Sequence, residues 1–392
     1  MTDGKLYRIL SLDGGGTWAL VQARALMKVF PDAGGHDVLR PFDLVVSNSG
    51  GSTVAASLAV GQSPADIADF ILDPDRRRLG FEPTWAERLR LARILPLPRF
   101  RTKAKRSSLR RELGKDSETK LTEWQQRFGA RPDLVIPAFD CDTERATFFR
   151  TNASSLAASR TASGPPNATL LDAVHASTTA PIVFFDEPAA IEGRKFWDGA
   201  VAGYNNPVLA GVVEAHANEV PLESIRVLSL GSGSVRRPLG GPLADPRFSR
   251  PFTPGLVSGW REFGTAILDD PPDAATFIAH VTLGGRLPKD GEAIVSGPVV
   301  RMAPVVRPVW NEQRRDWAWP SALADSDWAR LTRLALATIE QRDIELVDSL
   351  AAAWINDLVP NQPIRSTKYM TAEIGHDTFT ASLAAANEWL RL

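Results

Sequence analysis

Short apolar runs alternate along the chain with longer stretches in which apolar residues recur at helical spacing. The short runs are typical of buried strands and predict five of them, at residues 6–12, 41–46, 134–138, 147–149 and 224–230. The longer stretches predict helices at residues 18–30, 50–60, 63–72, 170–177, 327–358 and 378–390. Strands that alternate with helices indicate an α/β fold with a largely parallel sheet.

The pattern is weaker between residues 240 and 320, which are rich in proline, glycine and tryptophan. We expect mostly loops there, with a few short elements and a final strand at residues 301–306. Tryptophans also gather late in the chain, and such aromatic clusters are more typical of packed core than of a ligand-binding surface. They are Trp310, Trp317, Trp319 and Trp328.

The composition narrows the class of protein. The chain has 392 residues, 44% of them apolar, which is enough for one large domain or two ordinary ones. Its net charge of −1 gives no general attraction to nucleic acid. No apolar stretch approaches the roughly 20 residues of a membrane span, the N-terminus lacks a signal-peptide pattern, and Cys141 is the single cysteine. These features predict a soluble, cytoplasmic protein.

One segment, residues 76–115, departs from this balance. It holds fourteen Lys or Arg residues and three Glu, a net charge of +11. The ordinary interpretation is a solvated helical face. A second is peripheral contact with an anionic membrane, with Leu97 and Phe100 as shallow anchors and about 1 kcal/mol from each basic residue. A site for an anionic small ligand or nucleotide is a third, and nucleic-acid binding is the weakest.

Three consecutive glycines, Gly14, Gly15 and Gly16, follow the first predicted strand and Asp13. Glycine adopts backbone conformations closed to other residues, so the N–H groups of such a loop can converge on one point. The helix that follows adds the partial positive charge of its N-terminus. The loop therefore suits a phosphate or an oxyanion, although a ligand-free strand–helix turn is equally compatible with the sequence.

Ser49 follows the second predicted strand, with Gly51 two residues later. A nucleophilic serine commonly occupies a strained strand-to-helix turn with the pattern G-x-S-x-G. Here Ser47 stands in place of the first glycine, so the pattern is degraded. A serine nucleophile also needs a base, and His175 and His216 lie within helical patterns, where a structural role is more common. The better candidate is Asp198, which precedes a glycine-containing turn.

Taken together and in order, these blocks resemble the patatin-like phospholipase family across about residues 6–235. The nucleophile strand at residues 42–46 and the small-residue segment at residues 176–181 are similar to the family's blocks. So are the Asn-Asn-Pro-Val block at residues 205–208 and the late strand and turn at residues 228–233. The agreement of several blocks in one order is more specific than any single motif.

The resemblance implies a three-layer α/β sandwich with a mainly parallel central sheet, a helical cap insertion and C-terminal helices. It implies a hydrolase domain at residues 1–310, with the cap and basic insertion at about 61–130, and a helical extension at 311–392. It also implies a serine carboxylic-ester hydrolase with a Ser49–Asp198 dyad and an oxyanion hole at Gly14, Gly15 and Gly16. Phospholipids or other fatty acyl esters would be its substrates, without a metal or other cofactor.

Three positions depart from the family pattern. Trp18 stands where members usually carry Arg or Lys, Ser47 replaces the elbow glycine, and Ala200 stands where many members have a second glycine. The change at Trp18 could alter how the loop is anchored, but it does not remove a reacting atom. The three departures leave one alternative open, a lipid- or ligand-binding pseudoenzyme on the same fold. The oligomeric state is not expressed in the sequence.

Overall fold

The described residues of this computed structural model are 5–93, 95, 97–129, 132–236, 273–311, 313–334, 338–366 and 372–390. Within them, eight strands form one sheet in the order β5-β6-β3-β2-β1-β7-β9, with β4 paired to β3. Its strands are β1 (Tyr7–Leu12), β2 (Leu44–Ser47), β3 (Asp133–Asp140), β4 (Arg145–Arg150), β5 (Ala189–Ile191), β6 (Arg194–Asp198), β7 (Ile225–Leu230) and β9 (Val299–Met302).

The sheet is mixed and mostly parallel. Strand β1 pairs in parallel with β2 and β7, β2 with β3, and β7 with β9, whereas β4 and β6 run antiparallel to β3, and β5 runs antiparallel to β6. Short two-stranded pairings lie outside the sheet: β8 (Ser234–Val235) with β10 (Val305–Val306), β11 (Val309–Asn311) with β12 (Asp316–Ala318), and β13 (Arg365–Ser366) with β14 (Ala372–Ile374). The predicted α/β fold is confirmed.

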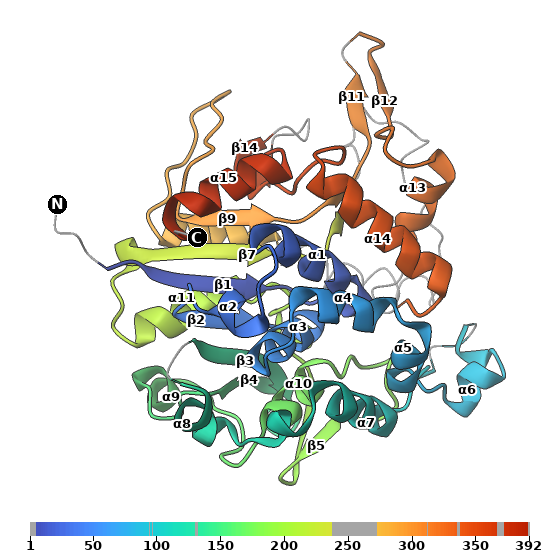
Figure 1. Ribbon diagram of the computed structural model, residues 1–392, viewed down its shortest axis with the longest axis vertical. Helices are drawn as coiled ribbons and strands as arrows, with labels where there is room; N and C mark the ends of the chain where they lie inside the picture. The colour runs from blue at the N-terminus through green and yellow to red at the C-terminus, as the bar shows by residue number, and fades with distance from the viewer. Residues whose placement is uncertain are drawn as a thin grey trace.

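Helices cover both faces of the sheet (Figure 1). The α-helices that precede β7 are α1 (Leu20–Val29), α2 (Gly35–Leu39), α3 (Ser49–Ala59), α4 (Pro64–Leu72), α5 (Pro74–Gly80), α6 (Trp85–Arg88), α7 (Thr102–Leu113), α8 (Trp124–Phe128), α9 (Leu156–Arg160), α10 (Leu170–Ser177) and α11 (Val208–Ala217). Later come α13 (Asp325–Leu331), α14 (Gln341–Ile355) and α15 (Phe379–Leu390). The 3₁₀ helices are η1 (Gly16–Ala19), η2 (Leu91–Arg93), η3 (Lys115–Glu118), η4 (Leu121–Glu123), η5 (Gly199–Ala202) and η6 (Leu222–Ser224).

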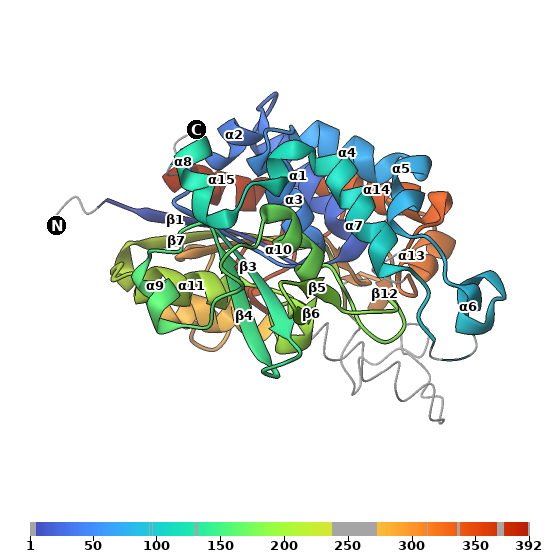
Figure 2. The ribbon, with the colours of Figure 1, turned by 90° about the horizontal axis from the view of Figure 1, so that it is seen from below.

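The alternation of side chains along the strands explains the layers. Leu10 and Val45 belong to the core beneath α1, α3, α10 and α14, whereas Ile9 and Val46 belong to the core beneath α11. Neighbouring residues of a strand point to opposite faces of a sheet, so continuous apolar runs bury both faces at once. Figure 2 shows α11 on one side of the sheet and α1, α3 and α14 on the other.

Helices α4 to α8 make up the predicted cap region. The start of α4 has a capping box, in which the Ser63 hydroxyl accepts the Asp66 N–H and the Asp66 carboxylate accepts the Ser63 N–H. The interpretation of Phe100 as a membrane anchor is wrong. Its side chain is fully buried, with its ring 5.0 Å from that of Phe81 and 6.2 Å from that of Phe185.

The C-terminal third returns to the N-terminal layer. Helix α14 lies beside α1 (Figure 1), where the Arg24 guanidinium pairs with the Asp348 carboxylate at 2.7 Å. The predicted helix at residues 327–358 is two helices, because the chain turns after α13 and Asp343 of α14 accepts bonds from Arg330 and Thr338 across that turn. Part of the predicted loop region, residues 240–272, lies outside the described residues. A helix runs through residues 273–282.

The late tryptophans form two ring pairs. The Trp310 and Trp317 centroids lie 5.4 Å apart, and Trp319 and Trp328 are stacked at 5.5 Å. Trp328 is fully buried and donates its indole N–H to the Pro320 carbonyl, which fits the expected core role. In the described part of the chain, none of the helices is long and apolar enough to cross a membrane.

Candidate active site

Ser49 occupies a strained turn between a strand and a helix. It is the first residue of α3 and has φ of 48°, a left-handed conformation that is uncommon for residues other than glycine. The preceding Asn48 is extended, with φ of −122° and ψ of 149°. Leu12 of β1 and Ser47 of β2 are register partners in parallel strands, so the loops that follow the two strands meet at one edge of the sheet.

The glycine loop packs directly against this turn. A β-carbon on Gly14 would lie 3.1 Å from the Ser49 Cβ and 2.3 Å from the Asn205 Oδ1. A β-carbon on Gly50 would lie 2.5 Å from the Gly16 carbonyl oxygen. Glycine is therefore required on both sides of the contact, and this close approach brings the loop alongside the serine.

Ser47 fits the position of the missing elbow glycine. It ends β2, its side chain is 1% exposed, and its Oγ has no hydrogen-bond partner among the described residues. The small hydroxymethyl group is thus accommodated inside the sheet edge without changing the turn at Ser49.

The three N–H groups of the glycine loop differ in availability. The Gly14 N–H donates to the Asn205 carbonyl at 2.7 Å, so it is already engaged. Among the described residues, no acceptor is bonded to the N–H of Gly15 or Gly16. Gly16 has φ of 54° and begins η1. The Ser232 hydroxyl donates to the Gly14 carbonyl at 2.8 Å and holds the loop from the far side.

A buried ion pair anchors the start of this loop. The Arg301 Nη2 lies 2.5 Å from the Asp13 Oδ2, and the two side chains are only 4% and 5% exposed. Arg301 also donates to Ser229 and Gln362. Burial raises the pKa of the Asp13 carboxyl, and the Arg301 guanidinium opposes that rise. This arginine was missed by sequence reasoning, because it lies 288 residues from Asp13 on β9.

Trp18 replaces a basic residue of the family pattern with a buried indole. The side chain is 3% exposed, and its ring atoms would lie 3.3 Å from a β-carbon on Gly233. Its indole nitrogen has no partner among the described residues. The cation beside the loop therefore comes from Arg301 of β9, and position 18 contributes packing.

Asp198 ends β6, which pairs with β3, the strand next to β2. It is 3% exposed, and its Oδ1 accepts the Asn48 side-chain amide at 3.0 Å and the Ala200 N–H at 2.9 Å. Burial raises the pKa of Asp198, while the nearby Ser49 hydroxyl, the bonds from Ala200 and Asn48 and the charge of Lys105 oppose the rise.

Asn48 and Ser177 form hydrogen bonds that hold Ser49 and Asp198 in place. The sequence motifs assigned no role to either residue. The Ser49 N–H donates to the Ser177 hydroxyl at 3.0 Å, and that hydroxyl donates to the Asn48 Oδ1 at 3.1 Å. Asn48 thus connects the serine turn to Asp198. The signal for Ser177 was its place in the small-residue block, which carried no chemistry by itself.

Lys105 is a buried cation close to the carboxylate. Its ammonium donates to the His175 carbonyl at 2.9 Å and to the hydroxyls of Thr178 and Thr179, and it lies 4.5 Å from the centre of the Phe185 ring. Three acceptors match its three N–H bonds. Burial lowers the pKa of Lys105 well below its ordinary value, and Asp198 opposes that change. Sequence reasoning had counted it as part of a surface charge run.

His175 is not placed to act as a base. It lies within α10 as predicted, is 3% exposed, and burial lowers its pKa to about 2, with Lys105 adding to the effect. It is therefore neutral throughout the physiological range. His216 lies in α11, on the opposite face of the sheet from α3.

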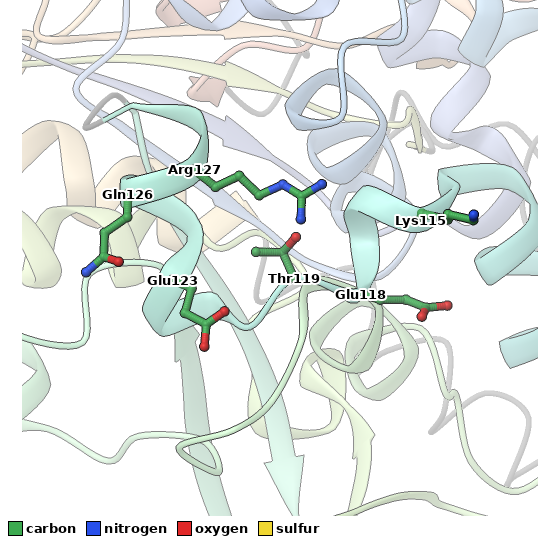
Figure 3. Close-up of a pocket in the computed structure, with 6 residues that line it drawn as sticks. All are labelled: Lys115, Glu118, Thr119, Glu123, Gln126 and Arg127. Carbon is green, nitrogen blue, oxygen red and sulfur yellow. The ribbon is translucent and has the colours of Figure 1, made fainter.

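A surface hollow of about 580 Å³ lies between η3 and α8 (Figure 3). Two cationic side chains, Lys115 and Arg127, and two anionic ones, Glu118 and Glu123, line it. Arg127 is paired with Asp116, and Glu118 with Arg110. Neither Ser49 nor Asp198 contributes to its wall, and its balanced charge gives no preference for an anionic ligand.

Several known proteins are similar to this chain. The family model of patatin-like phospholipases matches residues 10–212. A cGAMP-activated phospholipase of Vibrio cholerae serotype O1 is 25% identical over 251 residues, which are 57% of this chain and 64% of that protein. This chain therefore matches less than two thirds of that relative's length.

Two solved structures are also similar to this chain. VipD from Legionella pneumophila has 11% identity and a TM-score of 0.34, over 89% of this chain and 67% of that one. Human GIVD cytosolic phospholipase A2, in complex with methyl gamma-linolenyl fluorophosphonate, has 11% identity and a TM-score of 0.40, over 98% and 60%. Because the family model spans more than half of its residues, this chain belongs to the patatin-like phospholipase family.

Proposed function

We propose that this protein hydrolyses acyl esters of phospholipids or related lipids, with Ser49 as nucleophile and Asp198 as general base. One observation carries the proposal. A serine held at φ of 48° directly follows Asn48, whose side-chain amide donates at 3.0 Å to the buried Asp198 carboxylate, and it lies directly beside a glycine loop. A strained nucleophile, a base within reach and backbone donors are the parts that acyl transfer requires.

In the first half of the reaction, the Ser49 Oγ attacks the acyl carbon of the ester and its proton passes to Asp198. The tetrahedral intermediate collapses when the bond to the alcohol breaks, and Asp198 returns the proton to the departing oxygen. The products of this half are the free alcohol or lysolipid and an acyl group esterified to Ser49.

In the second half, water enters the same position as the departed alcohol. Asp198 removes one proton from the water while its oxygen attacks the acyl carbon. The Ser49 oxygen then leaves and recovers its proton from Asp198. A fatty acid is released, and serine and carboxylate return to their starting states.

The N–H groups of Gly15 and Gly16 are the proposed oxyanion donors. The Gly14 N–H is excluded from this role in the observed arrangement, because the Asn205 carbonyl accepts it at 2.7 Å. Removal of one such donor in other hydrolases reduces the rate by roughly 10²–10³-fold. Gly14 instead allows the loop to approach Ser49 closely, where any side chain would collide.

Burial tunes Asp198 for the work of a base. The desolvated site raises its pKa toward the operating pH, which strengthens it as a proton acceptor. Asn48 and Ala200 stabilise the ionised form, so the carboxylate remains ready to accept the serine proton. Activity should therefore fall as the pH is lowered through the raised pKa of Asp198.

We further propose that residues 1–310 form the hydrolase domain, with residues 61–130 as its cap and residues 311–392 as a helical extension. Two observations support these limits. Strand β9, at residues 299–302, completes the central sheet. Beyond it, Asp348 of α14 pairs with Arg24 of α1. The basic segment within the cap is the proposed place of contact with an anionic membrane.

A panel of short-chain aryl esters and phospholipids tests the function. We expect Ser49→Ala and Asp198→Asn each to reduce the rate by about 10³-fold or more. Ser57→Ala, a buried serine later in the same helix, is the matched control and should keep the parent rate. Circular dichroism should show parental folding in all three variants.

Two outcomes have distinct meanings. Turnover near the parent rate in purified Ser49→Ala would exclude the assigned nucleophile. A folded parent protein that binds phospholipid vesicles but hydrolyses none of the esters would favour the pseudoenzyme alternative.

A further inference from the structure

A small projecting tip, made of the described residues 83–93, 95 and 97–100, stands off the body of the protein. Its base is closed by backbone pairing of Pro83 with Phe100 and by the Thr84 N–H, which donates to the Arg99 carbonyl at 2.8 Å. The buried Phe100 ring fastens that base to the body through Phe185. Figures 1 and 2 both show α6, which belongs to this tip, away from the sheet at one extreme of the molecule.

The tip exposes large apolar side chains. Trp85 is 62% exposed, Leu89 67% and Leu95 49%. Isolated exposed leucines are ordinary on soluble proteins. Three such side chains within eleven residues, one of them tryptophan, are not expected on a face that meets only water, and tryptophan is enriched where protein meets the headgroups of a membrane.

A second exposed apolar group lies on the turn at residues 181–184 and on η5, which directly follows Asp198. Ile182 is 61% exposed, Val183 36% and Val201 41%. Ile182 also has φ of 68°, which is a genuine outlier for a β-branched residue and is typically kept for a functional reason. This residue lies in the loop that starts at Thr179, and the Thr179 carbonyl accepts the Asp198 N–H at 2.9 Å.

The two apolar groups belong to one connected structure. The N–H groups of Arg99 and Phe100, at the base of the tip, both donate to the Phe184 carbonyl, at 3.0 and 2.7 Å. Phe184 follows Ile182 and Val183 directly. We call the six exposed side chains the apolar rim; they are Trp85, Leu89, Leu95, Ile182, Val183 and Val201.

The charge beside Leu89, on the tip, is positive, whereas the exposed Asp186 and Glu187 follow Val183. Arg88 and Arg90 flank Leu89 and are exposed, and Arg90 has no ion pair among the described residues. Arg88 contacts Glu82 only at 3.4 Å and stays 57% exposed. Arginine stems can lie along apolar surface while the guanidinium reaches phosphate. Lys103, just beyond the base, is also exposed and unpaired in the described part of the chain.

We propose that the apolar rim docks on an anionic phospholipid bilayer, with Trp85 and Leu89 inserted at the headgroup boundary and Arg88 and Arg90 against lipid phosphates. The inference rests on the proposed function, because it presents the loops beside Asp198 to the surface that holds the ester. The sequence had suggested Phe100 as a membrane anchor, but Phe100 is buried. The proposed contact lies instead on the tip whose base Phe100 holds.

Vesicle co-sedimentation tests the docking separately from catalysis. The parent for this assay is Ser49→Ala, so that vesicles are not consumed. We expect it to bind phosphatidylcholine vesicles containing about one third phosphatidylglycerol more tightly than pure phosphatidylcholine. Adding Trp85→Ala and Leu89→Ser should weaken binding by about tenfold or more. Val213→Ser, at an exposed apolar site (55%) on α11, is the matched control and should bind as the parent does.

The outcomes separate cleanly. Unchanged vesicle binding in the Trp85→Ala, Leu89→Ser variant would overturn the docking proposal, whatever the ester assays show. If that variant instead changes the sedimentation mass of the protein and leaves vesicle binding intact, a second copy of this chain occupies the rim. If the unmodified protein, with Ser49 intact, hydrolyses no ester, that result counts against the proposed function and leaves the docking proposal standing.

Discussion

Replacing Arg301 by methionine perturbs the anchor of the glycine loop. The guanidinium lies 2.5 Å from the Asp13 carboxylate, with both side chains almost fully buried. Methionine has a similar length and fills the space with apolar atoms. The substitution therefore leaves the Asp13 carboxylate buried without its cation, at the first residue of the loop that lies beside Ser49.

The expected loss of folding free energy is about 3–5 kcal/mol, the usual consequence of removing one partner of a buried ion pair. Adding Asp13→Asn should recover a large part of it, because the uncompensated charge is then gone. The loss should also depend on pH. Burial raises the pKa of Asp13, Arg301 opposes that rise, and the variant lacks this opposition. A raised native-state pKa favours stability at low pH and loses that contribution as pH rises.

Urea unfolding at about pH 5 and about pH 8 measures both effects. We expect Arg301→Met to lose more stability at the higher pH, and its ester hydrolysis to fall further than its stability alone explains. Arg40→Met is the control, because its ion pair with Asp37 is 77% and 51% exposed and such pairs contribute about 0–1 kcal/mol. A loss below about 1 kcal/mol in Arg301→Met, or no recovery with Asp13→Asn, would refute the anchoring role.

Three further changes have defined outcomes. Lys105→Met removes a positive charge that lowers the pKa of Asp198, so the acidic limb of the pH profile of kcat/KM should move to higher pH; an unmoved limb contradicts the coupling. Gly14→Ala places a β-carbon 3.1 Å from that of Ser49 and should lower kcat by about tenfold or more, as steady-state kinetics will show. Trp18→Arg buries a cation without a partner and should lower the free energy of unfolding by roughly 3 kcal/mol, as urea unfolding will show. A variant that is more stable, or that hydrolyses esters faster, argues against a packing role for Trp18.

Local sequence rules predicted the elements on either side of the proposed nucleophile, but not β6, which carries Asp198. The apolar run before Asp13, the small residues after Ser49 and the serine–proline pair at residues 63–64 each specify their own conformation, and β1, α3 and α4 follow them. The order of the blocks then indicated which loops belong together, since parallel strands bring their C-terminal ends to one edge.

Contacts between distant parts of the chain could not be predicted in the same way. Phe100 is buried because it packs against the Phe81 and Phe185 rings. Lys105 can be buried because three oxygens at the end of α10 accept its N–H bonds. Both residues lie in the basic segment, whose composition alone suggests an exposed surface. Likewise, the Gly14 N–H is already bonded to a carbonyl 191 residues away in sequence, at Asn205, and so is left out of the proposed oxyanion donors.

The most direct test is covalent labelling with a fluorophosphonate probe, followed by intact-mass and peptide mapping. We expect one adduct per chain, located on Ser49, with much slower labelling in Asp198→Asn and no labelling in Ser49→Ala. An adduct on another serine, or labelling of Ser49→Ala at the parent rate, would contradict the assignment of Ser49 as the nucleophile.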